Sequence, residues 1–196
     1  MKKTIIEEYE AHLKKLRDEN SILKIKNDSF AHAQTLVSNL FEHAQKEVLI
    51  YTSSLCHQFY TSDKIIASFE QLKEKNIVPK IIIQYDFSRD EQFKDVIKQQ
   101  ESIEGMKKIF GDDFSPVFLS SEPYTISYQM EDGTSLAIHN FTVVDEKTFR
   151  YEKFETKKGD CVNPDGKYTN AVGCFNDQET TALLAETFRK HYKTQA

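Results

Sequence analysis

The chain has 196 residues, which is enough for one domain with an extension or for two small domains. Its formal net charge of −5 and its pI near 5.7 argue against a protein that coats nucleic acid through charge alone, although a local basic patch is compatible with both values. The three cysteines, Cys56, Cys161 and Cys174, form no CxxC pair, so we predict reduced thiols, no metal site and no disulfide framework. No stretch has the apolar length of a signal peptide or a membrane span, and we expect a cytoplasmic protein. Nothing in the composition indicates a cofactor.

Residues 1–30 predict a coiled-coil helix. They contain neither Pro nor Gly, and their apolar side chains recur at alternating spacings of three and four residues. One heptad seam contains, in order, Ile6, Leu13, Asn20 and Leu23. A buried Asn in such a seam favours a parallel pair of helices, so we predict a homodimer joined along it. The alternative is a single amphipathic helix that packs on its own domain.

Residues 31–196 predict one α/β domain. Residues 47–52 and 79–85 are short, nearly all-apolar runs, typical of strands covered on both faces, and residues 64–75 between them have helical periodicity. A strand, a helix and a strand of these lengths form a βαβ unit with parallel strands. The other expected elements are a helix at 91–110, strands at 117–119, 124–130 and 168–175, and a helix at 177–192. We therefore predict a mixed sheet flanked by helices.

Residues 134–154 predict a β-hairpin, because apolar and β-branched residues lie on both sides of a polar break that begins at Asp145. The first strand ends in the letters VVD. This pattern resembles the signature hairpin of the phospholipase D superfamily, in which a His-x-Lys-x-x-x-x-Asp motif lies on a strand that ends in two hydrophobic residues and Asp. With Asp145 as the anchor, Ile138 takes the place of the nucleophilic His, and Asn140 takes the place of the Lys.

The resemblance continues to the C-terminus and implies a phospholipase D-like fold without its catalytic groups. Lys153 falls near the family's Ser, and Ala171 falls on its Glu. Phosphodiester cleavage needs a nucleophile and a cation that holds the phosphate oxygens, and Ile138 and Asn140 supply neither. The resemblance thus implies a pseudoenzyme with a binding or regulatory role. Superfamily members with a single motif assemble their site across a two-fold dimer, so it also implies dimerisation through the cleft face.

The main alternative depends on His139. Successive strand side chains point to opposite faces, so His139 is expected to face away from the cleft unless a bulge turns it. If it faces the cleft, the chain is a phosphodiesterase or nuclease with a shifted motif formed by His139 and Asn140. A third hypothesis is an adaptor that holds a partner protein through the coiled coil. The sequence leaves contact with nucleic acid open.

The expected ligand-binding residues surround the same cleft. Ser53 and Ser54 follow the first parallel strand, at the edge where open α/β sheets place ligands. Asn140 lies on the motif strand, and Arg150 and Glu152 share a face of the second hairpin strand. Arg150 is able either to bind phosphate through two hydrogen bonds or to pair with Glu152 across a dimer. We predict recognition of a phosphate-containing ligand or of a partner protein.

Overall fold

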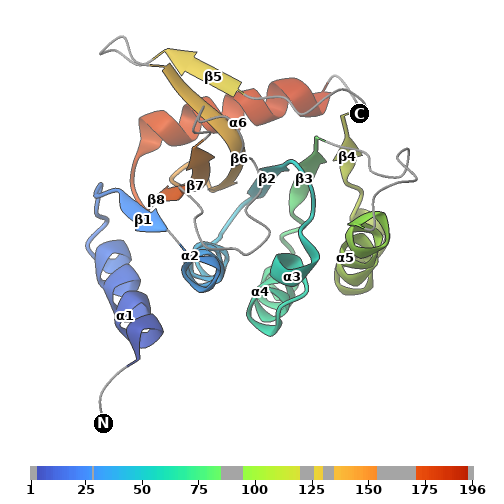
Figure 1. Ribbon diagram of the computed structural model, residues 1–196, viewed down its shortest axis with the longest axis horizontal. Helices are drawn as coiled ribbons and strands as arrows, with labels where there is room; N and C mark the ends of the chain where they lie inside the picture. The colour runs from blue at the N-terminus through green and yellow to red at the C-terminus, as the bar shows by residue number, and fades with distance from the viewer. Residues whose placement is uncertain are drawn as a thin grey trace.

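The computed structural model describes residues 4–27, 29–84, 95–119, 126–129, 135–153 and 171–193. They form an eight-stranded mixed sheet in the order β1-β8-β7-β6-β2-β3-β4, with β5 paired to the first part of β6 (Figure 1). Neighbours among β2, β3 and β4 are parallel, and all other pairs are antiparallel. The strands are β1 Ile25–Asn27, β2 Val48–Thr52, β3 Lys80–Ile83, β4 Val117–Phe118, β5 Ile126–Gln129, β6 Ser135–Val144, β7 Thr148–Lys153 and β8 Ala171–Cys174.

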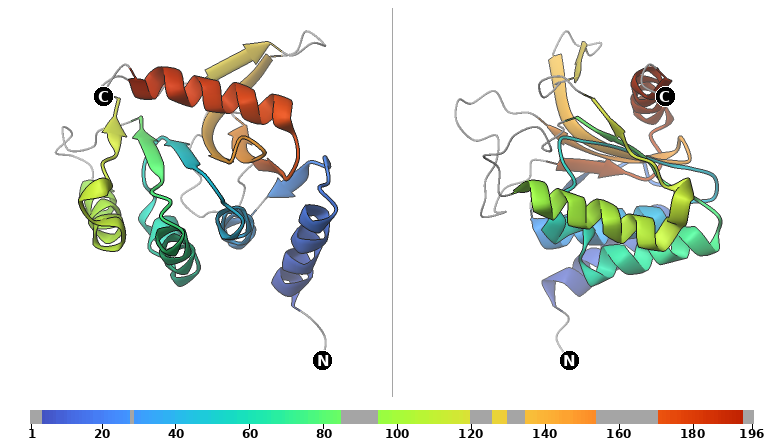
Figure 2. Two further views of the ribbon diagram at one scale, coloured as in Figure 1. Left: turned by 180° about the vertical axis from the view of Figure 1, so that it is seen from behind. Right: turned by 90° about the vertical axis from the view of Figure 1, so that its right-hand side faces the viewer.

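Helices cover both faces of the sheet. Figure 2 shows α1, α2, α4 and α5 on one face and α6 across the other. The helices are α1 Ile5–Asp18, α2 Phe30–Glu42, α3 His57–Tyr60, α4 Asp63–Glu74, α5 Asp95–Phe110 and α6 Gln178–Lys193, and a 3₁₀ turn follows α5 at Gly111–Asp113. The predicted class, an α/β protein with a mixed sheet flanked by helices, is confirmed. Within the described ranges, no helix has the length and apolar character needed to cross a bilayer.

Two hydrophobic cores follow from the alternation of side chains along the strands. In β2, Val48 and Ile50 face the core shared with α2 and α4, while Leu49 and Tyr51 face the core under α6. None of the four is more than 1% exposed. Both faces of β2 are covered, which explains why its sequence is nearly all apolar. A polar side chain on the α2 face of the neighbouring strands is therefore enclosed between sheet and helices.

The N-terminal helix is shorter than predicted. α1 ends at Asp18, the backbone turns at Asn20 with a left-handed φ of 48°, and residues 25–27 form β1. The expected helix through residue 30 is therefore wrong, and Asn20 and Leu23 lie beyond the end of α1. Asn tolerates the left-handed conformation better than most residues. The strand also gains backbone hydrogen bonds with β8 that a helix at this place would lose.

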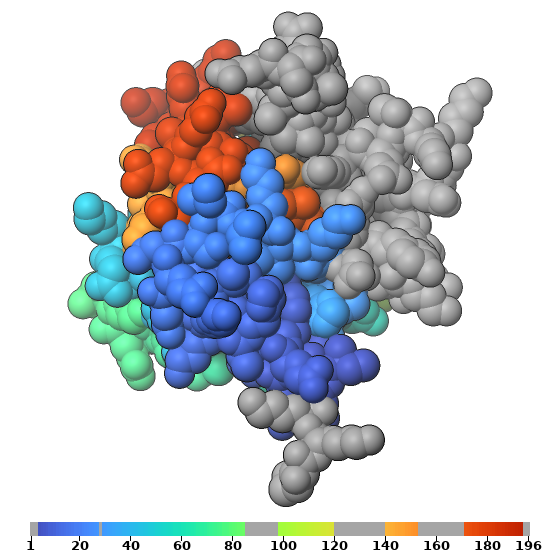
Figure 3. All heavy atoms as spheres, turned by 90° about the vertical axis from the view of Figure 1, so that its left-hand side faces the viewer, coloured from blue at the N-terminus to red at the C-terminus, as the bar shows by residue number. Residues whose placement is uncertain are grey.

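α1 packs on its own chain. Leu13 is fully buried and Leu16 is 4% exposed, both in the core that contains residues of α2 and α4. Figure 3 shows α1 against the body of the protein, with β1 between it and α6. This is the alternative arrangement, an amphipathic helix on its own domain. Leu23, expected in the same seam, is 63% exposed. The boundary expected after residue 30 falls within the first turn of α2, a helix that contacts β1.

Candidate functional site

The candidate site lies on the α2 face of the sheet, near the carboxyl end of β2. The register pairs Ile50 of β2 with Thr142 of β6, and Thr142 with Arg150 of β7. Directly opposed residues of antiparallel strands share a face, so Arg150 lies on the α2 face with Ile50. Glu152, two residues further along β7, and its partner Asn140 lie on that face as well. The hairpin therefore brings three polar side chains into the layer under the helices.

Asn140 is held at both ends of its side-chain amide. Its Oδ1 accepts a hydrogen bond from the backbone N–H of Ser53, with 2.6 Å between oxygen and nitrogen. Its Nδ2 donates to Oε2 of Glu152, also over 2.6 Å. Because a backbone N–H only donates and a carboxylate only accepts, these partners fix the orientation of the amide. Asn140 thus links the loop after β2 to the hairpin strand β7.

Arg150 continues this network. Its Nη2 donates to Oε1 of Glu152 over 2.7 Å, and the two side chains are 7% and 26% exposed. The guanidinium is therefore enclosed, and the carboxylate lies nearer to solvent. In the part of the chain that the structure describes, the Nε–H of Arg150 is a buried donor without an acceptor. An unsatisfied buried donor costs about 1–3 kcal/mol, so an additional acceptor would be favourable at this nitrogen.

Tyr60 of α3 lies beside the network. Burial raises the pKa of Tyr60 far above its ordinary value, Arg150 lowers this pKa, and Glu152 raises it. A hydrogen bond with Thr52 also lowers it. The Oγ1 of Thr52 donates to the carbonyl oxygen of Ser54 over 2.7 Å, so Ser54 takes part through its backbone. Tyr60 therefore presents a neutral hydroxyl near Arg150 and Glu152.

Tyr60 is not among the predicted site residues, because the sequence shows no periodic element between the strand at 47–52 and the helix at 64–75. The structure has a one-turn helix there, α3, with ring contacts from Phe59 to Phe30 and from Tyr60 to Phe69. The adjacent aromatic residues Phe59 and Tyr60 in a polar segment were the signal that this loop packs on the core.

The motif positions on β6 are described through their backbone. The register shifts between Ile138, which pairs with Lys153, and Asn140, which pairs with Glu152. His139 is therefore the additional residue of a β-bulge. The strict alternation behind the expectation that His139 faces away from the cleft does not continue through a bulge. The side chains of Ile138, His139 and Lys153 lie outside the described residues.

Ala171, where the resemblance places a Glu, is 2% exposed. It pairs with Glu152 on one side and with Asn27 of β1 on the other. A methyl group has no ionisable proton and no charge, so position 171 supplies no acid or base. The same strand allows α2 to approach closely, because a Cβ on Gly173 would lie 2.6 Å from Cδ2 of Leu36.

Asp145, which matches the Asp of the motif, lies at the other end of β6. It begins the β6–β7 turn with a left-handed φ of 55°. Its carboxylate accepts from the backbone N–H groups of Gln45, Lys46 and Glu47 at 2.7, 2.8 and 2.9 Å. These bonds join the turn to the segment before β2, so the observed role of Asp145 is to hold two parts of the backbone together.

The loop after β2 also contains Cys56 and His57. Cys56 is exposed at the start of α3. The Nε2 of His57 lies 3.1 Å from Oε2 of Glu101, a pair that joins α3 to α5. Nowhere in the described ranges do three His, Cys, Asp or Glu side chains gather in a way that could hold a metal ion.

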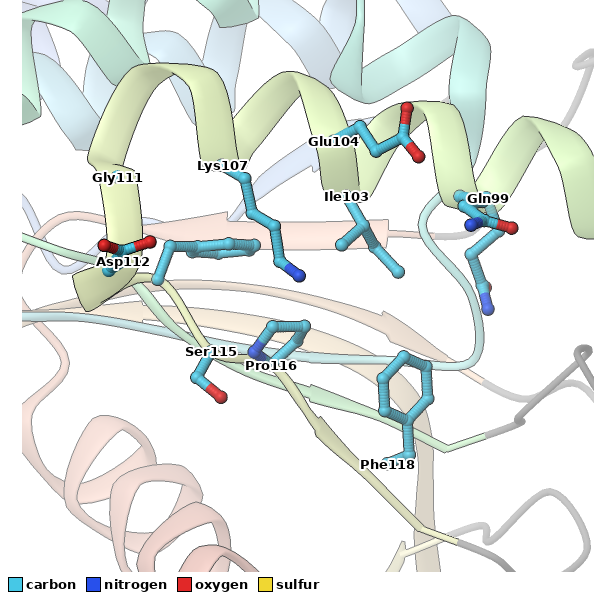
Figure 4. A pocket seen from close by; sticks show the side chains of 11 residues that line it. Gln99, Ile103, Glu104, Lys107, Gly111, Asp112, Ser115, Pro116 and Phe118 are labelled. Atoms are coloured by element: carbon cyan, nitrogen blue, oxygen red, sulfur yellow. The ribbon is translucent and has the colours of Figure 1, made fainter.

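Two cavities lie away from the network. One, of about 710 Å³, lies between α5 and β4; Figure 4 shows Ile103 and Lys107 on one side of it and Phe118 on the other. The other, of about 340 Å³, lies between α1, the end of α2 and the β6–β7 turn, where Arg17 and His43 line it. Neither is lined by a residue of the Asn140 network, so neither extends the candidate site.

No protein-family model matches the chain, and no curated protein matches it. Several solved structures are similar. NucT from Helicobacter pylori has a TM-score of 0.55 at 12% identity over 89% of this chain and 98% of its own. Nuc from Salmonella typhimurium, a phospholipase D family member, has a TM-score of 0.51 at 15% identity over 84% of this chain and 89% of its own. TrmBL2, an archaeal chromatin protein, has a TM-score of 0.48 at 13% identity, and the match covers 96% of this chain but only 60% of that one. At these identities, the two likenesses above 0.5 show how the chain is folded and nothing of its activity.

Proposed function

Because the chain has the phospholipase D-like fold, we propose that it is a degenerate version of that fold which binds a phosphate-containing ligand and does not cleave it. The proposal is carried by the side chain at position 140. Where the resemblance expects a Lys on the phosphate oxygens, Asn140 offers a neutral amide that already bonds Ser53 and Glu152. Phosphoryl transfer needs positive charge where negative charge develops, and this amide does not supply it.

Two other positions of the motif, 138 and 171, offer no replacement. Ile138 is aliphatic, and Ala171 is a buried methyl. A covalent mechanism requires a nucleophile and a group that donates a proton to the leaving oxygen. Arg150 brings positive charge, but Glu152 compensates it at 2.7 Å. These observations favour binding over cleavage.

Arg150 supports recognition of an anion. A planar guanidinium matches two phosphate oxygens with parallel hydrogen bonds. One donor of this group, Nε, bonds to nothing in the described ranges. The site also lies beside Ser53, after the carboxyl end of a parallel strand, where open α/β sheets bind ligands.

The first test is hydrolysis. The purified protein is incubated with bis(p-nitrophenyl) phosphate and with plasmid DNA, in EDTA. We expect no product above the buffer blank, and no change in Asn140→Ala. A cleavage activity that copurifies with the protein and is lost in the Asn140→Ala variant would contradict the proposal.

The second test is binding. Calorimetric titration with inorganic phosphate and with dimethyl phosphate is expected to show binding to the wild type and none to Arg150→Gln. The matched control is Arg189→Gln, because Arg189 of α6 pairs with Glu47 and Glu146 away from the site. Binding that survives in Arg150→Gln would place the ligand elsewhere and contradict the proposal.

The β-bulge favours one second candidate, a phosphodiesterase or nuclease that uses His139. Bulges re-aim side chains next to active sites, and His139 is the additional residue of this one. This candidate predicts metal-independent cleavage that is lost in His139→Ala and retained in His57→Ala. Absence of cleavage in the wild type would exclude it.

We also propose a homodimer formed through the cleft face. The resemblance to single-motif members supports it, whereas Leu13 and Leu16 already pack inside their own chain. Light scattering after gel filtration is expected to give twice the 22.8 kDa of one chain. A single-chain mass at micromolar concentration would contradict the dimer and leave the ligand proposal intact.

A further inference from the structure

Glu152 bonds to the donors that an anionic ligand would use. Its Oε1 accepts from Nη2 of Arg150 at 2.7 Å, and its Oε2 accepts from Nδ2 of Asn140 at 2.6 Å. Distances this short are typical of hydrogen bonds to an ionised group. A phosphate group, like a carboxylate, presents several oxygens that share negative charge. The Glu152 carboxylate therefore occupies the place that a bound oxyanion would take between the guanidinium and the amide.

The cation of this pair is fixed, and the anion lies nearer to solvent. Arg150 is 7% exposed, between Thr142 and Gly173 on the neighbouring strands. Glu152 is 26% exposed and lies one residue before the end of β7. The Glu152 side chain is therefore the one that is able to turn outward. If it did so without a replacement, a buried charge would be left unpaired, which is strongly unfavourable. The carboxylate is thus expected to leave only in exchange for another anion.

Glu152 leaves part of the guanidinium unused. Nε and Nη2 lie on the same edge of the group, and this edge binds two oxygens in a bidentate pair. Glu152 bonds Nη2, whereas Nε finds no acceptor among the described residues. A phosphate group has more oxygens than a carboxylate, so it is able to bond Asn140, Nη2 and Nε together. This favours phosphate over carboxylate as the anion that enters.

We infer that Glu152 is an internal competitor for the ligand, and that a phosphate oxyanion binds by displacing the Glu152 carboxylate from Arg150 and Asn140. The inference rests on the proposed function, because it states how that same site takes its ligand. Glu152 then lowers the affinity for every anion and rejects those too weak to replace it. Ligands without an anionic group have no means of displacing it.

The test compares the wild type with Glu152→Gln. Gln keeps the size of the side chain and one acceptor oxygen but removes the competing charge. Titrated with inorganic phosphate and with dimethyl phosphate, this variant is expected to bind at least about tenfold more tightly than the wild type, with a smaller gain for acetate. Glu47→Gln is the matched control, since Glu47 also pairs with an arginine, is 21% exposed and lies at the other end of β2. Its affinity is expected to equal that of the wild type.

Glu152→Ala gives an independent measurement. Its melting temperature in chloride buffer is expected to fall below that of the wild type, and phosphate is expected to raise it by more than in the wild type, because the added anion compensates the charge of Arg150. If Glu152→Gln binds no more tightly than a wild type that does bind phosphate, the exchange is wrong and the phosphate site stands. If neither the wild type nor a Glu152 variant binds phosphate, the proposed function fails as well. If Glu152→Gln does bind more tightly, the two titrants distinguish the ligand. Tighter binding of inorganic phosphate indicates a ligand with a terminal phosphate, and tighter binding of dimethyl phosphate indicates a phosphodiester.

Discussion

Arg150 and Glu152, two residues apart on β7, pair within a single chain, with 2.7 Å between Nη2 and Oε1. The sequence allowed a second pairing, across a dimer. The contact inside the chain follows from strand geometry, because residues i and i+2 share a face and this face lies under α2. The charge of the enclosed arginine is thus compensated without a partner subunit.

Truncating Glu152 is expected to destabilise the fold. Glu152→Ala leaves the guanidinium buried without its carboxylate, a change that costs about 3 kcal/mol, the lower end of the usual range because Glu152 is partly solvated. Urea unfolding measures the loss. The double variant Arg150→Met with Glu152→Leu removes both charges and is expected to recover most of it. A double variant as unstable as the single one would show that charge compensation is not the cause.

The parts of the fold that the sequence predicted are those in which local pattern determines the outcome. The apolar run of β2 and the helical periodicity of α4 each predict one element, and their lengths predict parallel pairing. The packing partner of the N-terminal helix is not determined by local pattern. Heptad spacing reports which side of a helix is apolar, and not what covers it. Leu13 and Leu16 have that spacing whether α2 or a second chain packs on them.

In the candidate site, too, the sequence predicted what depends on local pattern and missed what depends on tertiary packing. Strand alternation was enough to place Arg150 and Glu152 on one face of β7. The bulge at His139 was not predictable, because it depends on the register between β6 and β7 and not on either strand alone. The contribution of Tyr60 depends on how α3 packs over the end of β2, a tertiary feature without a local periodic signal.

Leu13 is expected to stabilise the chain on its own. Leu13→Ala removes a fully buried side chain and is expected to cost about 2–5 kcal/mol in urea unfolding, at every protein concentration. Leu23→Ala is the matched control, and with 63% exposure it is expected to cost less than about 0.5 kcal/mol. If Leu13→Ala instead changes the mass in solution, and its cost grows on dilution, the residue lies at an interface between chains.

Asp145 is expected to matter for stability and not for ligand binding. Asp145→Ala removes the acceptor of three backbone N–H groups and leaves Ala in a left-handed conformation, at a cost of about 3 kcal/mol. Asp145→Asn keeps one acceptor oxygen and tolerates the left-handed backbone, so we expect a smaller loss. Hydrogen exchange at residues 45–47 checks the mechanism, since these amides are expected to exchange faster in Asp145→Ala. Unchanged exchange would separate Asp145 from this segment.

Tyr60 is expected to make the protein sensitive to base. Its pKa is raised in the folded state from an ordinary value of 10.0, chiefly by burial, so folding favours the protonated hydroxyl. The resulting stabilisation is fully present below pH 10 and is lost as the pH rises above it, by up to about 1.4 kcal/mol per pH unit. Free energies of unfolding for the wild type and Tyr60→Phe between pH 8 and about 11.5 test this, and the variant is expected to show the shallower decline. Parallel curves would mean that Tyr60 titrates alike in the folded and unfolded chains.

Two glycines are expected to respond in opposite directions to the same change. A Cβ at Gly173, which pairs with Arg150, would meet Cδ2 of Leu36 at 2.6 Å and the carbonyl oxygen of Phe149 at 3.3 Å, so Gly173→Ala forces the buried Leu36 side chain of α2 to shift. Overpacking of this kind costs about 1–3 kcal/mol. For Gly105, inside α5, an added Cβ would meet no heavy atom of the described residues within 4 Å beyond its chain neighbours and the backbone of its own helix, and Gly105→Ala is expected to stabilise the protein by about 1 kcal/mol. In the Gly173→Ala background, Leu36→Ala is expected to cost less than it does alone, because it makes room for the new methyl. Additive losses in that double variant would mean that Leu36 is not the obstacle.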